Sequence, residues 1–200
     1  MIVLTVDQQN SRRTSDRIDA LLRHVSDRGT PVVRAFERTA GDEVQGVLSD
    51  PAATVDLVLD LVRQDAWSIG IGVGAVDQPL PDSTRAGSGP AFSLAREAVG
   101  RAKARPTGLA VTGSAAEPTR RVQASLDLLA AVVARRTERG WEAVDLAAQG
   151  LSQVEVAERL GITKQAVSQR LHAAEWYLEP AGRDLAAHLL SEANARLDRS

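Results

Sequence analysis

The segment that decides the fold of the first half of the chain is "PVVRAFERTAGDEVQGVL", residues 31–48. Two apolar, strand-like arms flank Gly41-Asp42, a pair that supplies the turn of a β-hairpin. Asp42 and Glu43 place two carboxylates directly after the glycine. They are either the polar residues that a turn ordinarily carries, or they hold a carboxylate at the sheet edge to bind a metal ion. The segment predicts a hairpin, and the rest of the chain has to decide between these two interpretations of its charge.

Three more apolar runs predict strands on either side of this hairpin. "MIVLTV", residues 1–6, is short and β-branched, which is typical of a buried strand. "WSIGIGVGAV", residues 67–76, and "GLAVTG", residues 108–113, have the same character. The glycines of the middle run are either part of a phosphate-binding pattern or the mark of a tightly packed strand.

Helical spacing of apolar residues predicts three helices in the same region. They cover about residues 13–28, 50–62 and 90–103, and the second begins at an Asp50-Pro51 pair that suits a helix start. The first six elements follow the order β-α-β-β-α-β. This order predicts an α+β, ferredoxin-like domain with its helices on one face of an antiparallel sheet.

The second half of the chain has a different pattern, with one helix after another and no candidate strand. The change falls near residues 114–119, so the sequence predicts two domains, residues 1–115 and residues 116–200. The second domain is expected to be entirely helical.

A helix-turn-helix pattern occupies residues 151–178 of this helical domain. Ser152 and Glu155 match a capping box, Gly161 permits a tight turn, and Thr163 can cap the second helix. Apolar positions that return to one inner face are Val156, Ala157, Leu160, Ile162, Val167 and Leu171. A plain helical hairpin with a solvated polar face is the alternative interpretation.

The outer side of the second helix carries the side chains that a DNA-recognition helix uses. Gln suits adenine edges, Lys and Arg suit guanine or phosphate, and Ser suits phosphate. We therefore expect double-stranded DNA as a partner, contacted by Thr163, Lys164, Gln165, Ser168, Gln169, Arg170 and His172. Arg135, Arg136 and Arg139 on the preceding helix are further candidates for phosphate contacts.

A last helix carries an apolar stripe that has two interpretations. Its members are Leu185, Leu189, Leu190, Ala193 and Leu197. The stripe either packs on its own chain or pairs with the same stripe of a second chain, which a two-fold reader of DNA would need.

Composition restricts the class of protein more than its function. Hydrophobic residues make up 44% and charged residues 25% of the 200, which indicates a globular chain rather than a fibre or a disordered tail. The formal net charge of −2 means that an argument for nucleic acid must come from a local motif. Cysteine is absent, which excludes disulfides, thiolate metal ligands and a cysteine nucleophile. Without a signal-peptide pattern or an apolar run near the roughly 20 residues that span a bilayer, we expect a cytoplasmic protein with no membrane partner.

The predicted strand order brings Asp7 and Asp42 together. Asp7 ends the first strand, and Asp42 lies in the turn of the hairpin that neighbours this strand. Mg²⁺ in proteins is usually held by one or two carboxylates together with substrate oxygens. The two aspartates therefore predict a site for Mg²⁺ and the phosphates of a nucleotide.

Residues 1–112 resemble the catalytic core of the class III adenylate and guanylate cyclases and, more distantly, the diguanylate cyclase domain. The resemblance rests on Asp7, on "RTAGDEVQGVL" at a Lys-x-x-Gly-Asp hairpin, on "IGIGVGAV" at a Gly-Ile-His-x-Gly strand, and on "GPAFSLAREA" at a Val-Asn-x-Ala-x-Arg segment.

By position, this resemblance implies metal binding by Asp7 and Asp42, base selection by Arg38 and a transition-state role for Arg96. The ligand-binding residues that follow from it are Arg38, Gly41, Phe92 and Arg96. Phe92 stands where the cyclases have the transition-state asparagine, and an aromatic ring cannot supply that hydrogen-bonding amide. The resemblance thus implies ligand binding and puts cyclising turnover in doubt.

Nearly the whole chain also resembles the SatD family of bacterial proteins. The shared features are "VDQQNSRR", "GDEVQG", "GSGPAFSLAREA" and the C-terminal helix-turn-helix, in this order. That resemblance implies an architecture more than a mechanism.

We therefore expect a homodimeric, DNA-binding transcriptional regulator whose cyclase-like domain senses a nucleotide or a cyclic dinucleotide, with Mg²⁺. Two alternatives stay open at this point. The first is an active nucleotidyl cyclase with a regulatory helical domain, and the second is a dimerisation module that binds no ligand and is fused to a DNA-binding domain. Turnover of ATP or GTP, binding without turnover, or no binding at all would distinguish the three.

Overall fold

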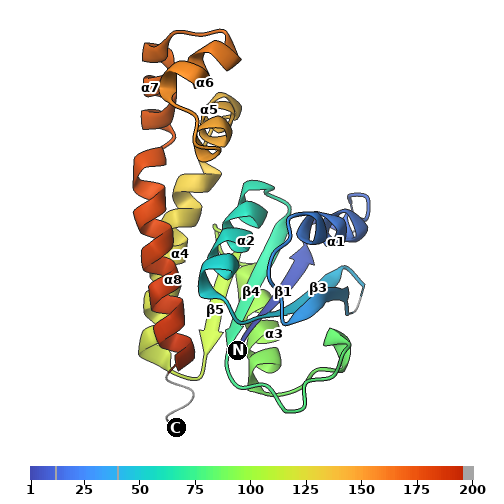
Figure 1. Cartoon of the computed structure of the whole chain (residues 1–200). Coiled ribbons are helices and arrows are strands. Elements are labelled where there is room, and N and C mark those ends of the chain that lie inside the picture. The colour runs from blue at the N-terminus through green and yellow to red at the C-terminus, as the bar shows by residue number, and fades with distance from the viewer. Residues whose placement is uncertain (12, 40, 196–200) are drawn as a thin grey trace.

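The computed structural model describes residues 1–11, 13–39 and 41–195. Within these residues the chain is α+β, with one five-stranded mixed sheet and eight α-helices (Figure 1). The N-terminal part follows the predicted βαββαβ order, and the C-terminal part is helical. None of the helices in the described part is long and apolar enough to cross a bilayer.

The strands form a sheet in the order β2-β3-β1-β4-β5. Their bounds are β1 Ile2–Gln8, β2 Arg34–Arg38, β3 Glu43–Leu48, β4 Trp67–Val73 and β5 Leu109–Gly113. β1 lies antiparallel between β3 and β4, and β2 pairs antiparallel with β3, so the predicted hairpin is confirmed. Gly41 has a φ of +58° in its turn, a value that glycine adopts without strain.

Helices α1, Ile18–Asp27, and α2, Pro51–Arg63, cover one face of this sheet. The Asp50 side chain caps α2 by accepting hydrogen bonds from the N–H groups of Ala52 and Ala53 at 2.8 and 3.2 Å. α1 begins later than the predicted residue 13. The segment before it is held as a loop, because the Gln8 side chain binds the backbone of Ser15 and Arg17.

The prediction of helices on one face of an antiparallel sheet is wrong in two respects. Helix α3, Pro90–Ala102, packs on the opposite face, and β5 pairs parallel with β4. The physical reason lies in the glycines of β4. A Cβ atom on Gly70 would lie 2.2 Å from the backbone nitrogen of Val99, and one on Gly72 would lie 2.2 Å from the carbonyl oxygen of Ala91. These glycines therefore let the α3 backbone approach the sheet.

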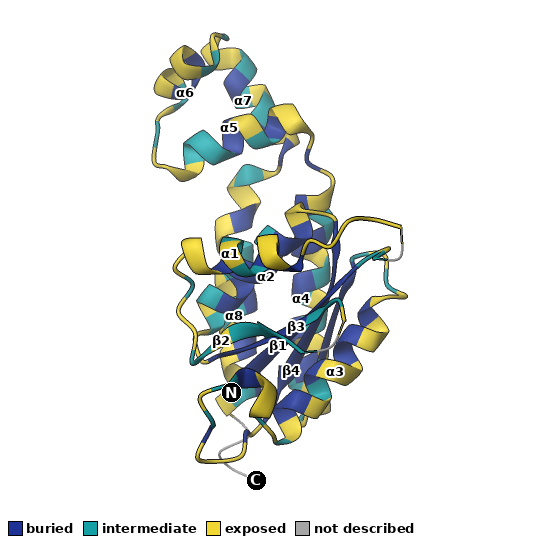
Figure 2. Cartoon of the chain, turned by 90° about the vertical axis from the view of Figure 1, so that its right-hand side faces the viewer, coloured by how far each residue is buried: buried dark blue, intermediate teal, exposed yellow. Residues whose placement is uncertain are grey.

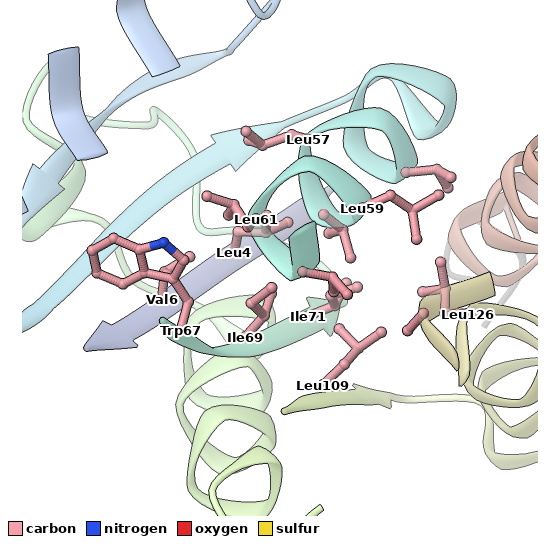
Figure 3. Packing of buried hydrophobic residues seen from close by; sticks show 14 of the residues in the cluster. Leu4, Val6, Leu57, Leu59, Leu61, Trp67, Ile69, Ile71, Leu109 and Leu126 are labelled. Atoms are coloured by element: carbon pink, nitrogen blue, oxygen red, sulfur yellow. The ribbon is translucent and has the colours of Figure 1, made fainter. Parts of the chain in front are cut away.

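The long helices α4, Ala116–Ala134, and α8, Glu179–Ala195, pack beside α2 and share its core. Figure 3 shows Leu126 of α4 next to Leu109 and Ile71 of the sheet. The predicted boundary between residues 115 and 116 thus falls between β5 and α4, two elements of one hydrophobic cluster. In Figure 2, buried residues run along the strands and along the inner sides of the helices.

The apolar stripe of α8 packs on its own chain. Ala186, Leu190 and Ala193 are buried in the cluster formed by the sheet, α2 and α4. Leu185 is 55% exposed, and Leu197 lies outside the described residues. Of the two interpretations of the stripe, the structure therefore supports packing within the chain.

The helices α5, Glu138–Ala148, α6, Gln153–Leu160, and α7, Lys164–Ala173, form a separate bundle at one end of the molecule (Figures 1 and 2). They close on a cluster of their own that contains Val144, Val156, Val167 and Leu171. The bundle is thus inserted between the long helices α4 and α8, which carry it away from the sheet.

Candidate functional site

The corner between α6 and α7 has the local geometry that the sequence predicts. Ser152 and Glu155 form the capping box: the Ser152 N–H donates to the Glu155 carboxylate at 2.7 Å, and the Glu155 N–H donates to Ser152 Oγ at 3.4 Å. The hydrogen bond from the Ser152 backbone holds the pKa of Glu155 below its ordinary value. Gly161 takes the left-handed conformation with φ +63°, and Thr163 caps α7 by accepting from the Ala166 N–H at 3.1 Å.

The outer side of α7 presents most of the predicted DNA-contacting residues to solvent. Lys164, Gln165, Gln169 and His172 are exposed, and Ser168 is half-buried. The remaining predicted residues already have partners inside the chain.

Thr163 uses its hydroxyl as the helix cap, and Arg170 makes an ion pair with Glu142 of α5 at 2.8 Å. The His172 ring also lies 5.3 Å from the Tyr177 ring, measured between centroids.

Arg136 is not available for a phosphate, contrary to the expectation from sequence. Its side chain is 1% exposed and forms an ion pair with Glu179, the first residue of α8. Its Nε donates to the Ala174 carbonyl at 2.8 Å. Arg135 and Arg139 remain exposed on either side of it. One residue of this basic segment thus belongs to the core, because it lies where α4, α7 and α8 converge.

A polar network joins the helical bundle to the sheet layer at this point. Arg63, the last residue of α2, donates two hydrogen bonds to the carboxylate of Asp145 in α5, at 2.6 and 2.8 Å. Its guanidinium carbon lies 3.9 Å from the ring centroid of Trp141, and that of Arg136 lies 4.7 Å from it. Because both arginines lie over one indole, the end of α2 and the end of α4 together hold α5.

A polar cavity of about 970 Å³ opens at the other functional region, where β1 ends and β4 and β5 begin. The cationic side chains in its wall belong to Arg13, Lys103 and Arg105. Asp7 and Asp42 also line it, as does Gly41 of the hairpin turn. The volume lies at the upper end of the ~300–1,000 Å³ that small-molecule sites usually have.

The structure brings Asp7 and Asp42 to one cavity, as the strand order predicts. The Gln8 N–H donates to the Asp42 carbonyl at 3.1 Å, which holds the hairpin turn beside the end of β1. The Asp7 carboxylate accepts a hydrogen bond from Lys103 Nζ at 2.8 Å. The ammonium group therefore compensates one of the two neighbouring negative charges.

Two carboxylates in one cavity fit a Mg²⁺ ion that arrives with a nucleotide, since phosphate oxygens would then complete its ligands. They fit an ion held by the protein alone less well. Lys103 already neutralises Asp7, and the described residues contain no group of three or more His, Asp or Glu side chains placed to hold a metal.

The other residues expected from the cyclase resemblance are placed differently. Arg38 donates to Asp16 at 2.6 Å, and Asp16 is part of the cavity wall. The pKa of Asp16 lies below its ordinary value because the Ile18 N–H and then Arg38 donate hydrogen bonds to its carboxylate. Phe92 is buried in an apolar cluster between α3 and the sheet, and Arg96 is exposed on α3. The structure does not bring Phe92 or Arg96 to the cavity.

Lys103 and Arg105 are the cavity residues that the sequence argument missed. They belong to "KARPTG", residues 103–108, which connects α3 to β5. A basic loop between a predicted helix and a predicted strand was the available signal. Its meeting with Asp7, which is 96 residues away in the chain, depends on the packing of α3.

No family model, curated protein or solved structure matches the chain. The resemblances to the SatD family and to the nucleotidyl cyclases therefore stay predictions.

Proposed function

We propose that this protein is a DNA-binding transcriptional regulator whose N-terminal part binds a nucleotide or a related phosphate ligand. The observation that carries the proposal is the capped α6–α7 corner. Its inner side is closed on α5, and its outer side exposes Lys164, Gln165 and Gln169. Glutamine amides can bind an adenine edge with two hydrogen bonds, and lysine can bind guanine or phosphate. α7 is therefore the recognition helix of a helix-turn-helix.

The cavity at the end of β1 is the ligand site in this proposal. Its cations, Arg13, Lys103 and Arg105, suit phosphate oxygens. Asp7 and Asp42 would hold a Mg²⁺ ion that accompanies the ligand, and the ion would neutralise phosphate charge there. The strand order β4-β1-β3-β2, with α1 and α2 on one face, supports a ferredoxin-like core of the kind that the cyclase resemblance implies.

A nucleotidyl cyclase is the second candidate, because both aspartates of the expected metal pair line one cavity. Phe92 counts against it. A ring packed in the core cannot donate a hydrogen bond to developing charge, and no other residue is known to take the place of the asparagine amide. Binding without turnover is the function that these positions support better.

Ligand and DNA sites share structural elements in this proposal. Val62 at the end of α2 and Ala134 at the end of α4 line the cavity. The arginines that hold Trp141 of α5, Arg63 and Arg136, are one and two residues further along the same helices. A ligand that binds one arrangement of these helix ends more tightly than another would change the orientation of the helix-turn-helix and hence DNA affinity.

We propose that two copies of the chain bind one operator. A single helix-turn-helix contacts a half-site, and a dimer reads two half-sites about one helical turn apart. An operator selected from random duplexes is therefore expected to be an inverted repeat that binds two chains, as sedimentation of the complex would measure. A single half-site bound by one chain would contradict the dimer.

Replacing Lys164, Gln165 and Gln169 by alanine is expected to remove the preference for a selected operator. Each good bidentate contact contributes about 1–3 kcal/mol of discrimination, so the ratio of operator to scrambled-duplex affinity should fall at least tenfold. Fluorescence anisotropy with both duplexes measures this ratio. Ser93→Ala/Arg96→Ala, two exposed positions of α3 with the same change of charge, is the control. An unchanged ratio in the triple variant would remove α7 from recognition.

A nucleotide that binds the cavity is expected to raise the melting temperature, and more so with Mg²⁺. A ligand at 100 times its Kd stabilises the folded state by about 2.7 kcal/mol. Thermal melts with ATP, GTP and cyclic dinucleotides measure the shift, and analysis of the same mixtures for cyclic products detects turnover. The shift should vanish in Lys103→Ala and lose its Mg²⁺ dependence in Asp7→Ala/Asp42→Ala, while Arg23→Ala behaves as wild type. Equal shifts in all variants would place the ligand elsewhere.

A further inference from the structure

A second groove lies in the helical bundle, between the start of α5 and one side of α7. It has a volume of about 450 Å³. Its walls carry the guanidinium groups of Arg135, Arg139 and Arg170, and small residues such as Ala166 and Ala173 keep it open. No carboxylate lines it, although the chain as a whole is slightly acidic.

The arginines of this groove differ in how far they are engaged within the chain. Arg170 is held by Glu142 at 2.8 Å. Arg135 donates only its Nε, to the Ala131 carbonyl of its own helix at 2.9 Å. Among the described residues, neither Arg135 nor Arg139 has a carboxylate within ion-pair distance, and both side chains are exposed. Two guanidinium groups therefore face the groove without a counter-charge, while Arg170 is fixed in its wall.

The groove borders the recognition face of α7. Gln169 belongs to both, because it lines the groove and is exposed on the outer side of the helix. Gln165 lies one turn earlier, at the i, i+4 spacing that places two side chains on the same side of a helix. When these amides reach base edges in a major groove about 12 Å wide, the phosphates of one bordering strand lie to the side of α7.

We infer that this groove receives the sugar–phosphate backbone of one DNA strand, with Arg135 and Arg139 each neutralising a phosphate. The inference rests on the proposed function, since it takes α7 as the recognition helix. It adds α4 and α5 to the DNA-binding surface and assigns them the positioning contacts, which carry no base preference. Arg170 shapes the groove wall through Glu142 and is not one of the two phosphate contacts.

The test is the salt dependence of DNA binding by Arg135→Gln/Arg139→Gln. For duplex DNA, the slope of log affinity against log salt changes by about 0.9 for each phosphate that is neutralised. The variant is expected to have a slope shallower by about 2. Over a fourfold rise in salt its affinity should therefore fall about 12-fold less than that of the wild type. The change should be the same on operator and scrambled duplex, so that their affinity ratio is unchanged.

Two further variants separate this effect from general loss of charge. Arg135→Lys/Arg139→Lys retains both charges and is expected to keep the wild-type slope. Arg120→Gln/Arg121→Gln removes two exposed arginines at the far end of α4 and should also keep it. A wild-type slope in Arg135→Gln/Arg139→Gln, or a changed slope in either control, would overturn the groove assignment. It would leave the helix-turn-helix in place, whereas a wild type that binds no duplex would overturn the proposed function itself.

Discussion

Glu179→Ala is expected to lower the free energy of unfolding by about 3–5 kcal/mol, because it leaves a buried charge without its partner. Glu179 and Arg136 form an ion pair whose side chains are 4% and 1% exposed. The same carboxylate accepts a hydrogen bond from Arg183 Nε at 2.6 Å. Urea denaturation measures the loss, and the effect should reach DNA binding because Arg136 also lies over Trp141 of α5.

Two comparisons show whether the buried charge is the cause. Asp184→Ala removes an exposed carboxylate from the same helix and should change stability by no more than about 0.5 kcal/mol. Arg136→Met/Glu179→Leu removes both charges and should be more stable than Glu179→Ala, since no unpaired charge stays buried. A Glu179→Ala variant within 1 kcal/mol of wild type, by the order of magnitude that separates buried from surface pairs, would contradict this account of the joint.

Gly72→Ala is expected to destabilise the protein by about 3 kcal/mol or more, the upper end of the cost of overpacking a core. A Cβ at this position would lie 2.2 Å from the Ala91 carbonyl oxygen and 2.4 Å from the Ala95 nitrogen. Both are backbone atoms, so only a shift of α3 as a whole can relieve the overlap. Combining it with Gly70→Ala should abolish a cooperative thermal transition, because net stabilities are only about 5–15 kcal/mol.

Gly100→Ala is the matched control for these glycines. Gly100 lies within α3, and a Cβ there would have no heavy atom within 4 Å. Alanine is the better helix former, so this variant should be more stable by about 0.5–1 kcal/mol. Calorimetry of the three variants measures the contrast. A Gly72→Ala protein that melts at the wild-type temperature would show that the glycines are not needed for the approach of α3.

Features that depend on neighbouring residues could be predicted from the sequence. The capping box of Ser152 and Glu155 spans three residues, and the turn glycines Gly41 and Gly161 need only their own backbone conformation. The same holds for the Asp50 cap of α2. Because these interactions close within one turn of chain, composition and spacing are sufficient to place them.

The candidate site could be predicted only in part. Asp7 and Asp42 meet because adjacent strands fix their positions, and a strand order can be inferred from a pattern of elements. The partner of Asp7 could not be inferred, since Lys103 reaches it from the end of α3 on the face of the sheet that the sequence argument left uncovered. For the same reason the positions of Phe92 and Arg96 relative to the cavity followed from the packing of α3 and from nothing local.

The sequence by itself determined where the hairpin turns, where the helix-turn-helix begins and bends, and which side chains α7 presents. The tertiary structure alone decided which face of the sheet α3 covers, that the α8 stripe packs on its own chain, and that Arg136 is buried while Arg135 and Arg139 are exposed. The difference has a physical cause. Caps and turns are short-range hydrogen bonds and backbone preferences, whereas burial of a stripe or of one arginine among three depends on surfaces that meet only when distant segments pack.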